Sequence, residues 1–449
     1  MKNSLRYLSL CGLLGYGYSA ESLKNALSGE LDFVGVDAGS TDPGAYYLGS
    51  GKGFVKRLQV KRDLSLILPV IKERKIPLII GSAGGSGARP HVESVLEIIA
   101  EIASELNTSF DTAVIYSDLD NDFLKRAAQG HLTGCGGAPD FDPALADKLC
   151  NPVAQFGTDP IIEALKGNPE IIVAGRCCDT AVFAAYPIWK GFPAGLALHA
   201  AKIAECGALC ARPVGANDSL VVEMYQDHFT VEPPNPERSC TPESVAAHSL
   251  YEQPDPNCFY EPEGKIDLSN CTFEALSARK VKVSGSALVP AEKHTTKLEG
   301  ALLNGFRSIT IAGLRDPSAV KHLDEIEEKV RASVAASANF IQEKDYTLRF
   351  LRYGLDAVTG SNEPAGILPR EVGLVIEAIA PSQELADALI GLARSKALHQ
   401  GFPDRKATAG NLAFPFSPSD FSGGAVYEFA LYHLTDLELE FKVERLVIK

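Results

Sequence analysis

The chain has 449 residues, of which 45% are hydrophobic, so it is long enough for two or three domains that each bury a core. Its 57 acidic and 43 basic residues give a formal net charge of −14, and no run of Lys and Arg interrupts the pattern. This composition argues against nucleic acid and membranes as partners, and we expect a soluble cytoplasmic protein without a bilayer-spanning segment.

The first twenty residues, MKNSLRYLSLCGLLGYGYSA, admit two interpretations. A basic start, a short apolar stretch and a small residue near a plausible cleavage point are typical of a signal peptide. However, Gly12, Gly15 and Gly17 interrupt the apolar stretch, and Ser19 is placed to cap a helix. The favoured interpretation is a strand, a glycine turn and a helix that open an α/β domain, with secretion as the alternative.

Residues 1–193 alternate between short apolar strands and helical stretches. Strands are predicted at 7–11, 32–36, 77–80, 112–116 and 171–174, and helices at 63–74, 92–106 and 159–165. This alternation predicts an α/β ligand-binding domain with a parallel, doubly wound sheet. Several of the strands run into glycine-rich loops, which gather at the carboxyl ends of such a sheet, where ligands bind.

The rest of the chain is expected to form two further regions. Residues 194–300 combine a helical stretch with strands around a segment rich in Pro and Asp, which indicates a mixed α/β insertion or lid. Residues 301–449 follow the order strand, helix, strand, strand, helix, strand, which predicts a ferredoxin-like α+β domain. We expect that domain to serve as a scaffold or as a dimer surface.

The loop GVDAGSTDPGAYYLGSG contains the first candidate site residues. Its glycines allow close approach, and its amides could form an anion site to which Ser40 and Thr41 add hydroxyl groups. Asp37 and Asp42 would repel an anion unless one is protonated or a divalent cation is bound. Asp37 ends a strand and could act as a general base, while the simpler alternative is that both carboxylates cap turn amides.

The loop GSAGGSGARPHVE leads into a predicted helix, whose free amides favour an anion. Ser82, Gly84, Gly85 and Arg89 are its candidate substrate-binding residues, because the planar guanidinium of arginine binds carboxylates and phosphates in a bidentate way. The loop lacks the Lys-Ser/Thr of a P-loop and the spacing of a dinucleotide site, so nucleotide binding by these routes is not expected.

The stretch AGRCCDT places Arg176 and Asp179 around two thiols where a strand gives way to a helix. A helix start beside a cation lowers the pKa of a thiol, so Cys177 or Cys178 could act as a nucleophile. No histidine lies nearby in the sequence to form a Cys/His pair, so Arg176 is favoured as a ligand-binding residue. Asp179 is then a helix cap or an acid-base group.

The long uncharged loop TAGNLAFPFSPSDFSGG contains Asn411, which could reach an active site, although a structural loop is the simpler interpretation.

The ten cysteines form no disulfide framework and no clear zinc spacing, so reduced thiols and no resident metal are expected.

Four quoted stretches occur in order along almost the whole chain: VDAGSTDPGAYYLGSG, IPLIIGSAGGSG with PHVE, IVAGR with DTAVF, and GNLAFPFSPSD with VYEFALYHL. Together they resemble the acyclic terpene utilisation protein AtuA family. The resemblance implies a role in degrading branched acyclic terpenoid acids as coenzyme A thioesters. No catalytic residue is carried over with it. The adjacent Cys177 and Cys178 depart from the family's stretch, which argues against a covalent thiol mechanism.

The predicted function is that of a hydratase, dehydratase or isomerase that acts on an acyclic or branched carboxylic acid or acyl-CoA. Asp37, Asp42 and Asp179 are the candidate acid-base residues, and loop amides with Arg89 and Arg176 are expected to hold the carboxylate. No cofactor is expected, and the chain is expected to form a homo-oligomer. One alternative is a non-catalytic accessory subunit. The other is an actin-like ATPase, because the stretch GVDAGST superficially resembles the phosphate loop of that class of protein.

Overall fold

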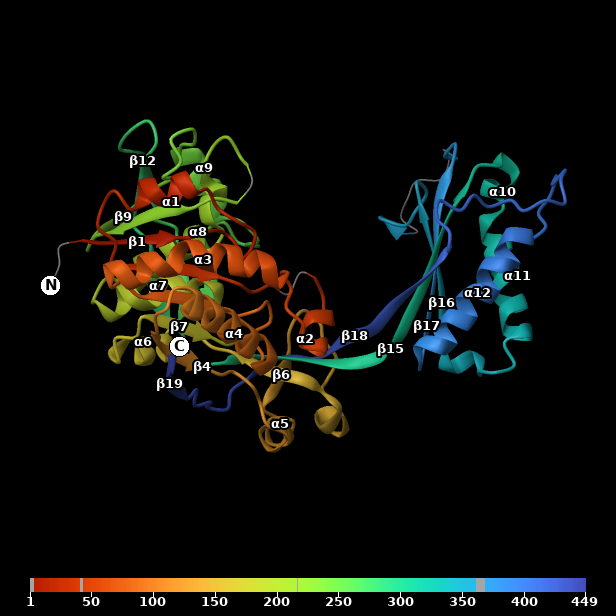
Figure 1. Cartoon of the computed structure of the whole chain (residues 1–449), viewed down its shortest axis with the longest axis horizontal. Helices are drawn as coiled ribbons and strands as arrows, with labels where there is room; N and C mark the ends of the chain where they lie inside the picture. Colours follow the sequence, from red (N-terminus) through yellow and green to blue (C-terminus); the bar gives the residue numbers. More distant parts are fainter. Residues whose placement is uncertain (1–3, 41–42, 216, 361–367) are drawn as a thin grey trace. The chain divides into compact units, whose positions relative to one another are not determined.

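The computed structural model describes residues 4–40, 43–215, 217–360 and 368–449 (Figure 1). The chain divides into two compact units. Unit 1 comprises Met1–Leu302 with Phe429–Lys449, and unit 2 comprises Leu303–Glu428. The segment 194–300, which was expected as a mixed α/β insertion or lid, lies within unit 1.

Unit 1 is built on a ten-stranded sheet with the order β12-β13-β9-β8-β1-β2-β3-β7-β4-β19 (Figure 1). Five neighbouring central strands are parallel: β1 (Leu5–Ser9), β2 (Phe33–Asp37), β3 (Leu78–Gly81), β7 (Ile171–Ala174) and β4 (Phe110–Ile115). The flanking strands are antiparallel: β8 (Leu220–Met224), β9 (His228–Glu232), β13 (Val281–Ser284) and β12 (Thr272–Ala275) at one edge and β19 (Val443–Ile448) at the other. The sheet is therefore mixed, and only its centre is parallel, because strands from beyond residue 193 complete both edges.

Helices cover both faces of the parallel centre, because its strands are apolar on both sides. One core cluster joins Leu8, Val34 and Ile80 to helices of one face, and a second joins Tyr7 and Phe33 to helices of the other. The first face carries α1 (Ala20–Ala26), α3 (Arg57–Arg74) and α4 (Arg89–Glu105). The second carries α6 (Asp159–Lys166), α7 (Asp179–Trp189) and α8 (Ala194–Ala204).

The remaining elements of unit 1 are short. A separate three-stranded sheet has the order β10-β11-β14, formed by β10 (Cys258–Glu261), β11 (Gly264–Asp267) and β14 (Ala287–Pro290). The other elements are α2 (Tyr46–Ser50), α5 (Asn121–Ala127), α9 (Pro242–Ser249), β5 (Leu132–Gly134), β6 (Cys150–Gln155) and 3₁₀ turns at Pro143–Lys148 and Gly207–Cys210.

Unit 2 contains strands in the order β16-β17-β15-β18, with β17 antiparallel to both β16 and β15. Along the chain its elements are β15 (Thr296–Leu314), α10 (Pro317–Lys321), α11 (Leu323–Ser337), a 3₁₀ turn (Glu343–Asp345), β16 (Thr347–Tyr353), β17 (Val372–Ala380), α12 (Gln383–His399) and β18 (Asp420–Thr435). One core cluster joins α11, α12 and β17. The start of β15 and the end of β18 belong to unit 1, where they pair with β6 and β5.

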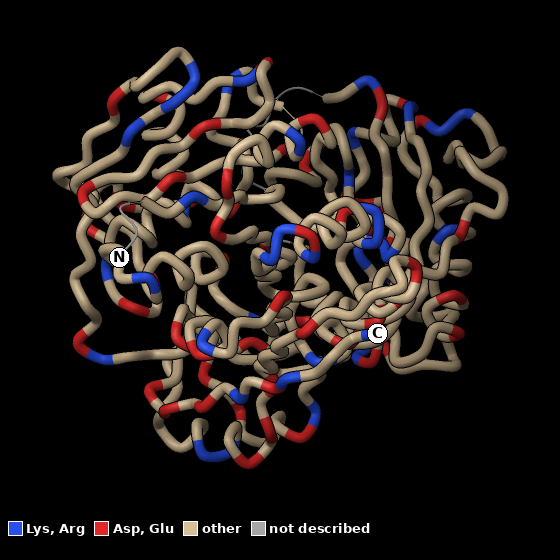
Figure 2. Tube along the Cα trace, turned by 60° about the vertical axis from the view of Figure 1, so that its left-hand side comes forward, with Lys and Arg blue, Asp and Glu red and all other residues tan. Residues whose placement is uncertain are grey.

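Within the described ranges, no helix combines the length and the apolar character needed to cross a membrane. Figure 2 shows Lys and Arg interspersed with Asp and Glu along the trace.

Candidate active site

Three glycine-rich loops lie side by side at the carboxyl ends of β2, β3 and β7. The Ser40 amide donates to the Gly85 carbonyl (3.1 Å), and the Ala83 amide donates to the Ala174 carbonyl (3.0 Å). Ser82 connects two of these loops, because its Oγ accepts from the Cys177 amide (3.2 Å) and donates to the Cys177 carbonyl (3.1 Å). Segments that are far apart in the sequence therefore build one end of unit 1.

The glycines of these loops allow backbones to touch. A Cβ at Gly87, whose φ is +66°, would lie 2.1 Å from the Arg176 amide nitrogen. A Cβ at Gly39 would lie 2.3 Å from the Cβ of Ser82. Only a residue without a side chain allows such an approach. Some of the backbone amides that were expected to bind an anion instead form hydrogen bonds between the loops.

Gly87→Ala should destabilise unit 1 more than Gly136→Ala. Both glycines have a left-handed backbone, with φ of +66° and +59°, so both substitutions carry the same conformational cost of about 1–2 kcal/mol. At Gly136 no atom lies within 4 Å of the added Cβ. At Gly87 the clash with the Arg176 backbone should add about 1–3 kcal/mol. Urea unfolding of the two variants measures the difference in unfolding free energy. Equal losses of unfolding free energy would refute the role of Gly87 in close packing against Arg176.

A pocket of about 300 Å³ opens beside these loops. Among the described residues, four carboxyl side chains line it: Asp37, Asp179, Glu205 and Glu252. Its lining also includes the apolar or aromatic side chains of Leu13, Tyr16, Phe54 and Leu209, whereas no Lys or Arg of the described residues is among the lining. We call this site the carboxyl pocket.

Asp37 lies at the end of β2 and is only 3% exposed. Its Oδ2 accepts a hydrogen bond from the Gly39 amide (3.0 Å), while its buried Oδ1 has no hydrogen-bond partner. Burial raises the pKa of Asp37 well above its usual value, and the negative charge of Asp179 raises it further. Asp37 is therefore a carboxyl group that holds its proton to higher pH than an ordinary aspartate.

Asp179 is the first residue of α7, and 42% of its side-chain surface is exposed. Its Oδ1 lies 3.8 Å from Nη1 of Arg176. Desolvation raises the pKa of Asp179, and the positive charge of Arg176 opposes that shift. Asp179 thus combines access to the pocket with a neighbouring cation that stabilises its ionised form.

Glu205 follows α8 and is buried, with its Oε1 2.6 Å from Nζ of Lys202. Burial raises its pKa to about 7, although Lys202 lowers it. Glu261 lies on β10 and accepts a hydrogen bond from Thr180 Oγ1 (2.7 Å), and burial raises its pKa to about 8. Burial thus shifts the pKa of both carboxyl groups towards neutral pH, the range that suits a general acid or base.

The stability of the Glu261→Gln variant relative to the native protein should increase as pH rises. A folded-state pKa near 8 lies above the unfolded value, so folding of the native chain takes up a proton between these values and stability falls as pH rises through that window. Buried His199, whose pKa is lowered, gives the opposite trend below its usual pKa, so the comparison between variants isolates Glu261. The difference in melting temperature should grow from pH 5.5 to pH 8.5, whereas Glu97→Gln on the exposed surface of α4 should show no such change. A pH-independent difference for Glu261→Gln would contradict the assignment.

Arg176 is engaged by a partner that the sequence analysis missed. Its Nε lies 3.0 Å from Glu299 Oε2 and its Nη2 lies 3.3 Å from Oε1, and the Arg176 and Glu299 side chains are 5% and 1% exposed. Lys297 Nζ also lies 2.8 Å from Glu299 Oε1. Burial alone would raise the pKa of Glu299, but the two cations lower it to about 2. Arg176 therefore holds the loop in place through Glu299, and its bidentate face is already used.

The structure places the other predicted residues in different surroundings. Ser40 lines the carboxyl pocket, and the Gly84 carbonyl accepts from the Phe54 amide (3.0 Å). Arg89 is exposed at the start of α4, with its guanidinium 3.8 Å from the centre of the Tyr116 ring, and does not line the pocket. Thr41 and Asp42 lie outside the described residues.

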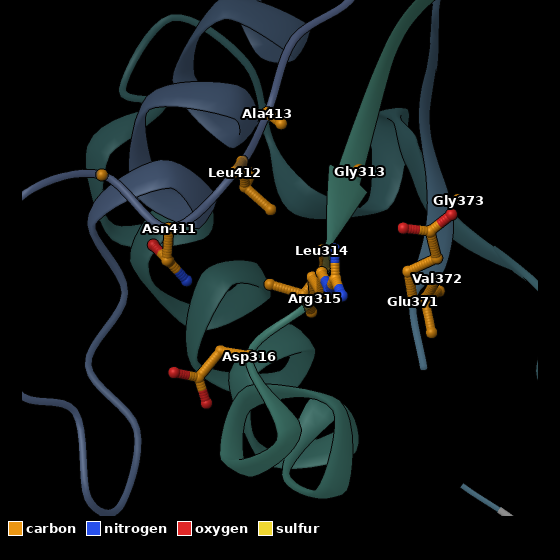
Figure 3. A pocket seen from close by; sticks show the side chains of 11 residues that line it. Gly313, Leu314, Arg315, Asp316, Glu371, Val372, Gly373, Asn411, Leu412 and Ala413 are labelled. Atoms are coloured by element: carbon orange, nitrogen blue, oxygen red, sulfur yellow. The ribbon is translucent and has the colours of Figure 1, made fainter. Parts of the chain in front are cut away.

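Asn411 lines a different pocket, which belongs to unit 2 and has a volume of about 560 Å³. Gly313 of β15 and Gly373 of β17 are opposite each other in the sheet and also line it. Figure 3 shows Arg315, Glu371 and Asn411 around this hollow. The Asn411 Oδ1 atom is buried and has no hydrogen-bond partner. Asn411 is thus not among the residues of the carboxyl pocket.

Two chemical alternatives lose support. Burial, together with the negative charges of Asp37 and Asp179, raises the pKa of Cys177 to about 12, so the nucleophilic thiolate is disfavoured. In the described chain, the element after β2 is helix α2, not the second strand of a hairpin expected for an actin-like phosphate loop. Within the described ranges no group of three His, Cys, Asp or Glu side chains could hold a metal ion, and Asp42, considered as a cation ligand, lies outside them.

The sequence contained one signal for the missed residues of the pocket. In the helix AGLALHAAKIA, Lys202 is the only charged residue, and Glu205 follows it at a spacing of three. An isolated ion pair on an otherwise apolar helix indicates burial of both charges. No comparable signal marked Glu252, which also lines the pocket. Outside the lining, Glu261 and Glu299 were missed because their partners Thr180 and Arg176 are distant in the chain.

The fold and the site define an α/β protein with clustered carboxyl groups at the carboxyl ends of parallel strands. The chain matches the family described as acyclic terpene utilisation family protein AtuA over residues 49–412, and it belongs to that family. The predicted resemblance is thereby confirmed for most of the chain. Searches of the curated proteins and of the solved structures find no match.

Proposed function

We propose that the protein is an enzyme of acyclic or branched carboxylic acid or acyl-CoA metabolism that hydrates, dehydrates or isomerises its substrate by acid-base catalysis. The observation that carries this proposal is the meeting of Asp37, Asp179 and Glu205, whose pKa values are all raised, in one pocket. Perturbed carboxyl groups that converge in a pocket are typical of acid-base sites. Membership of a family named for acyclic terpene utilisation supports the substrate class.

Dehydration needs a proton donor and a proton acceptor at the same time. The acid protonates the leaving hydroxyl group, the C–O bond breaks and water departs. The base removes a proton from the neighbouring carbon, and the electrons of that C–H bond form the C=C bond. Protonated Asp37 is suited to be the acid, and Asp179, beside Arg176, is suited to be the base. Hydration is the reverse, and an isomerase would move a proton between two carbons with the same groups.

Two finer features of the fold belong to the same proposal. The parallel centre of unit 1, with helices on both faces, supports a doubly wound arrangement. The element order of unit 2 and its strand order β16-β17-β15-β18 support a ferredoxin-like domain.

The test is to incubate the purified protein in deuterated water with branched hydroxy and unsaturated acids and their CoA thioesters. We expect interconversion of at least one hydroxy and unsaturated pair, or a shift of its double bond, with deuterium incorporated at the carbon that exchanges a proton. The absence of both binding and turnover across the panel would reject the proposal. It would favour a non-catalytic accessory subunit, for which Asp37→Asn leaves the activity of the pathway unchanged.

A further inference from the structure

We propose, resting on the proposed function, that the carboxyl pocket receives an uncharged, hydroxyl-bearing or unsaturated branched end of the substrate and excludes the carboxylate. The substrate's carboxylate or thioester then stays outside the pocket, so the reacting carbon lies away from it. This orientation is opposite to the anion-binding pocket that the sequence predicted.

The charges around the pocket carry the first step. Four carboxyl groups line it, and no Lys or Arg of the described residues does. Two cations lie beside lining residues, Arg176 near Asp179 and Lys202 near Glu205, and each has a carboxylate partner: Arg176 pairs with Glu299 and Lys202 pairs with Glu205. With Asp37 protonated, a carboxylate ligand would still meet Asp179, Glu205 and Glu252, and it would meet no Lys or Arg among the described lining residues.

The size of this repulsion decides the preference. Two like charges 4 Å apart repel about four times more strongly at the effective dielectric constant of a protein surface than in water. At such a surface, one contact of this kind is enough to weaken binding by about tenfold or more. A neutral group of the same shape avoids that cost.

A buried polar atom of one lining residue, Asp37 Oδ1, favours a hydroxyl group. Asp37 is 3% exposed, it lines the pocket, and its Oδ1 has no hydrogen-bond partner. A hydroxyl group can donate to this oxygen when Asp37 is ionised and accept from it when Asp37 is protonated. A carboxylate can do only the second. A ligand hydroxyl therefore satisfies Asp37 in both of its charge states.

The apolar part of the wall accounts for the rest of the ligand. Leu13, Tyr16, Phe54 and Leu209 offer hydrocarbon and ring surface. The pocket volume of about 300 Å³ is at the lower end of the range for small-molecule sites. It suits a branched hydrocarbon end with one hydroxyl group, while a coenzyme A group would remain outside.

The test compares a branched hydroxy acid with its primary amide, which has nearly the same shape and no charge. Calorimetry on the full chain at pH 8, where Glu205 is ionised, should show the amide binding about tenfold or more tightly than the acid. Equal or tighter binding of the acid would overturn the inference, and so would the absence of binding by both ligands.

Glu205→Gln provides the matched variant, because it leaves Lys202 without its carboxylate partner. The acid should then bind about tenfold more tightly than it does to the native chain, with the amide little changed. Glu223→Gln removes a carboxylate that pairs with Lys280 outside the pocket, and it should change neither affinity. Binding and turnover separate the two proposals. If the amide binds more tightly but no substrate is turned over, only the proposed function is rejected. If a substrate is turned over but the acid binds more tightly than the amide, only the proposed orientation of the substrate is rejected.

Discussion

Asp37→Asn should lower turnover by about 10²- to 10⁴-fold, the range that one acid-base group contributes. Asparagine keeps the shape of the side chain, and its oxygen can still accept the hydrogen bond from the Gly39 amide. It cannot exchange a proton with the substrate. Because the substitution also removes a buried carboxyl group that lies near Asp179, the melting temperature should stay the same or rise. Steady-state kinetics and thermal unfolding measure the two effects.

Asp111→Asn is the matched control for this substitution. Asp111 lies on β4, far along the chain from the pocket residues, and forms an ion pair with Arg445. It does not line the carboxyl pocket, so turnover should stay within about twofold of the native value. Full activity of Asp37→Asn in a folded protein would remove Asp37 from the mechanism.

Glu299→Ala should cost about 3–5 kcal/mol of unfolding free energy, the range for removing one partner of a buried ion pair. The Arg176 guanidinium, only 5% exposed, would keep its charge and lose both hydrogen bonds to Glu299. Its remaining carboxylate neighbour is Asp179, whose Oδ1 lies 3.8 Å away and whose side chain is 42% exposed. The loop after β7 should therefore lose one of its anchors, while the hydrogen bonds of Ser82 to the Cys177 backbone remain.

The control for Glu299→Ala is Lys297→Met, which leaves the pair of Arg176 and Glu299 intact. Lys297 is 21% exposed at its side chain, so its loss should cost about 1 kcal/mol or less. The stabilisation by Glu299 should be complete above its unfolded pKa and fade as pH falls towards about 2, its folded value. Chemical unfolding at neutral and acidic pH measures both effects, and equal losses for the two variants would show that Arg176 does not depend on Glu299.

The sequence predicted the centre of the fold well, because local patterns encode it. The five predicted strands of residues 1–193 correspond to β1, β2, β3, β4 and β7, with ends shifted by a few residues. Val320, Leu323, Ile326, Val330 and Val334, which recur at helical spacing in the sequence, are buried on α10 and α11. Period-two and period-3.6 patterns of apolar residues carry this information directly.

The edges of the sheet and the partners within the site could not be predicted in the same way. Strands β8, β9, β12, β13 and β19 pair with the centre across long stretches of chain, and no local pattern states which sheet a strand joins. Arg176 and Glu299 are separated by 123 residues, so their pairing was not visible and Arg176 was interpreted as a ligand-binding residue. Arg89 was assigned to the site from its position at a helix start, but its side chain lies on the Tyr116 ring.

The most direct measurement is a crystal structure with the amide of a branched hydroxy acid bound. We expect its hydroxyl group within hydrogen-bond distance of Asp37 Oδ1, with the hydrocarbon end among Leu13, Tyr16 and Phe54. Ligand density beside Arg315 and Asn411 in the pocket of unit 2, with the carboxyl pocket empty, would contradict the assignment of the active site.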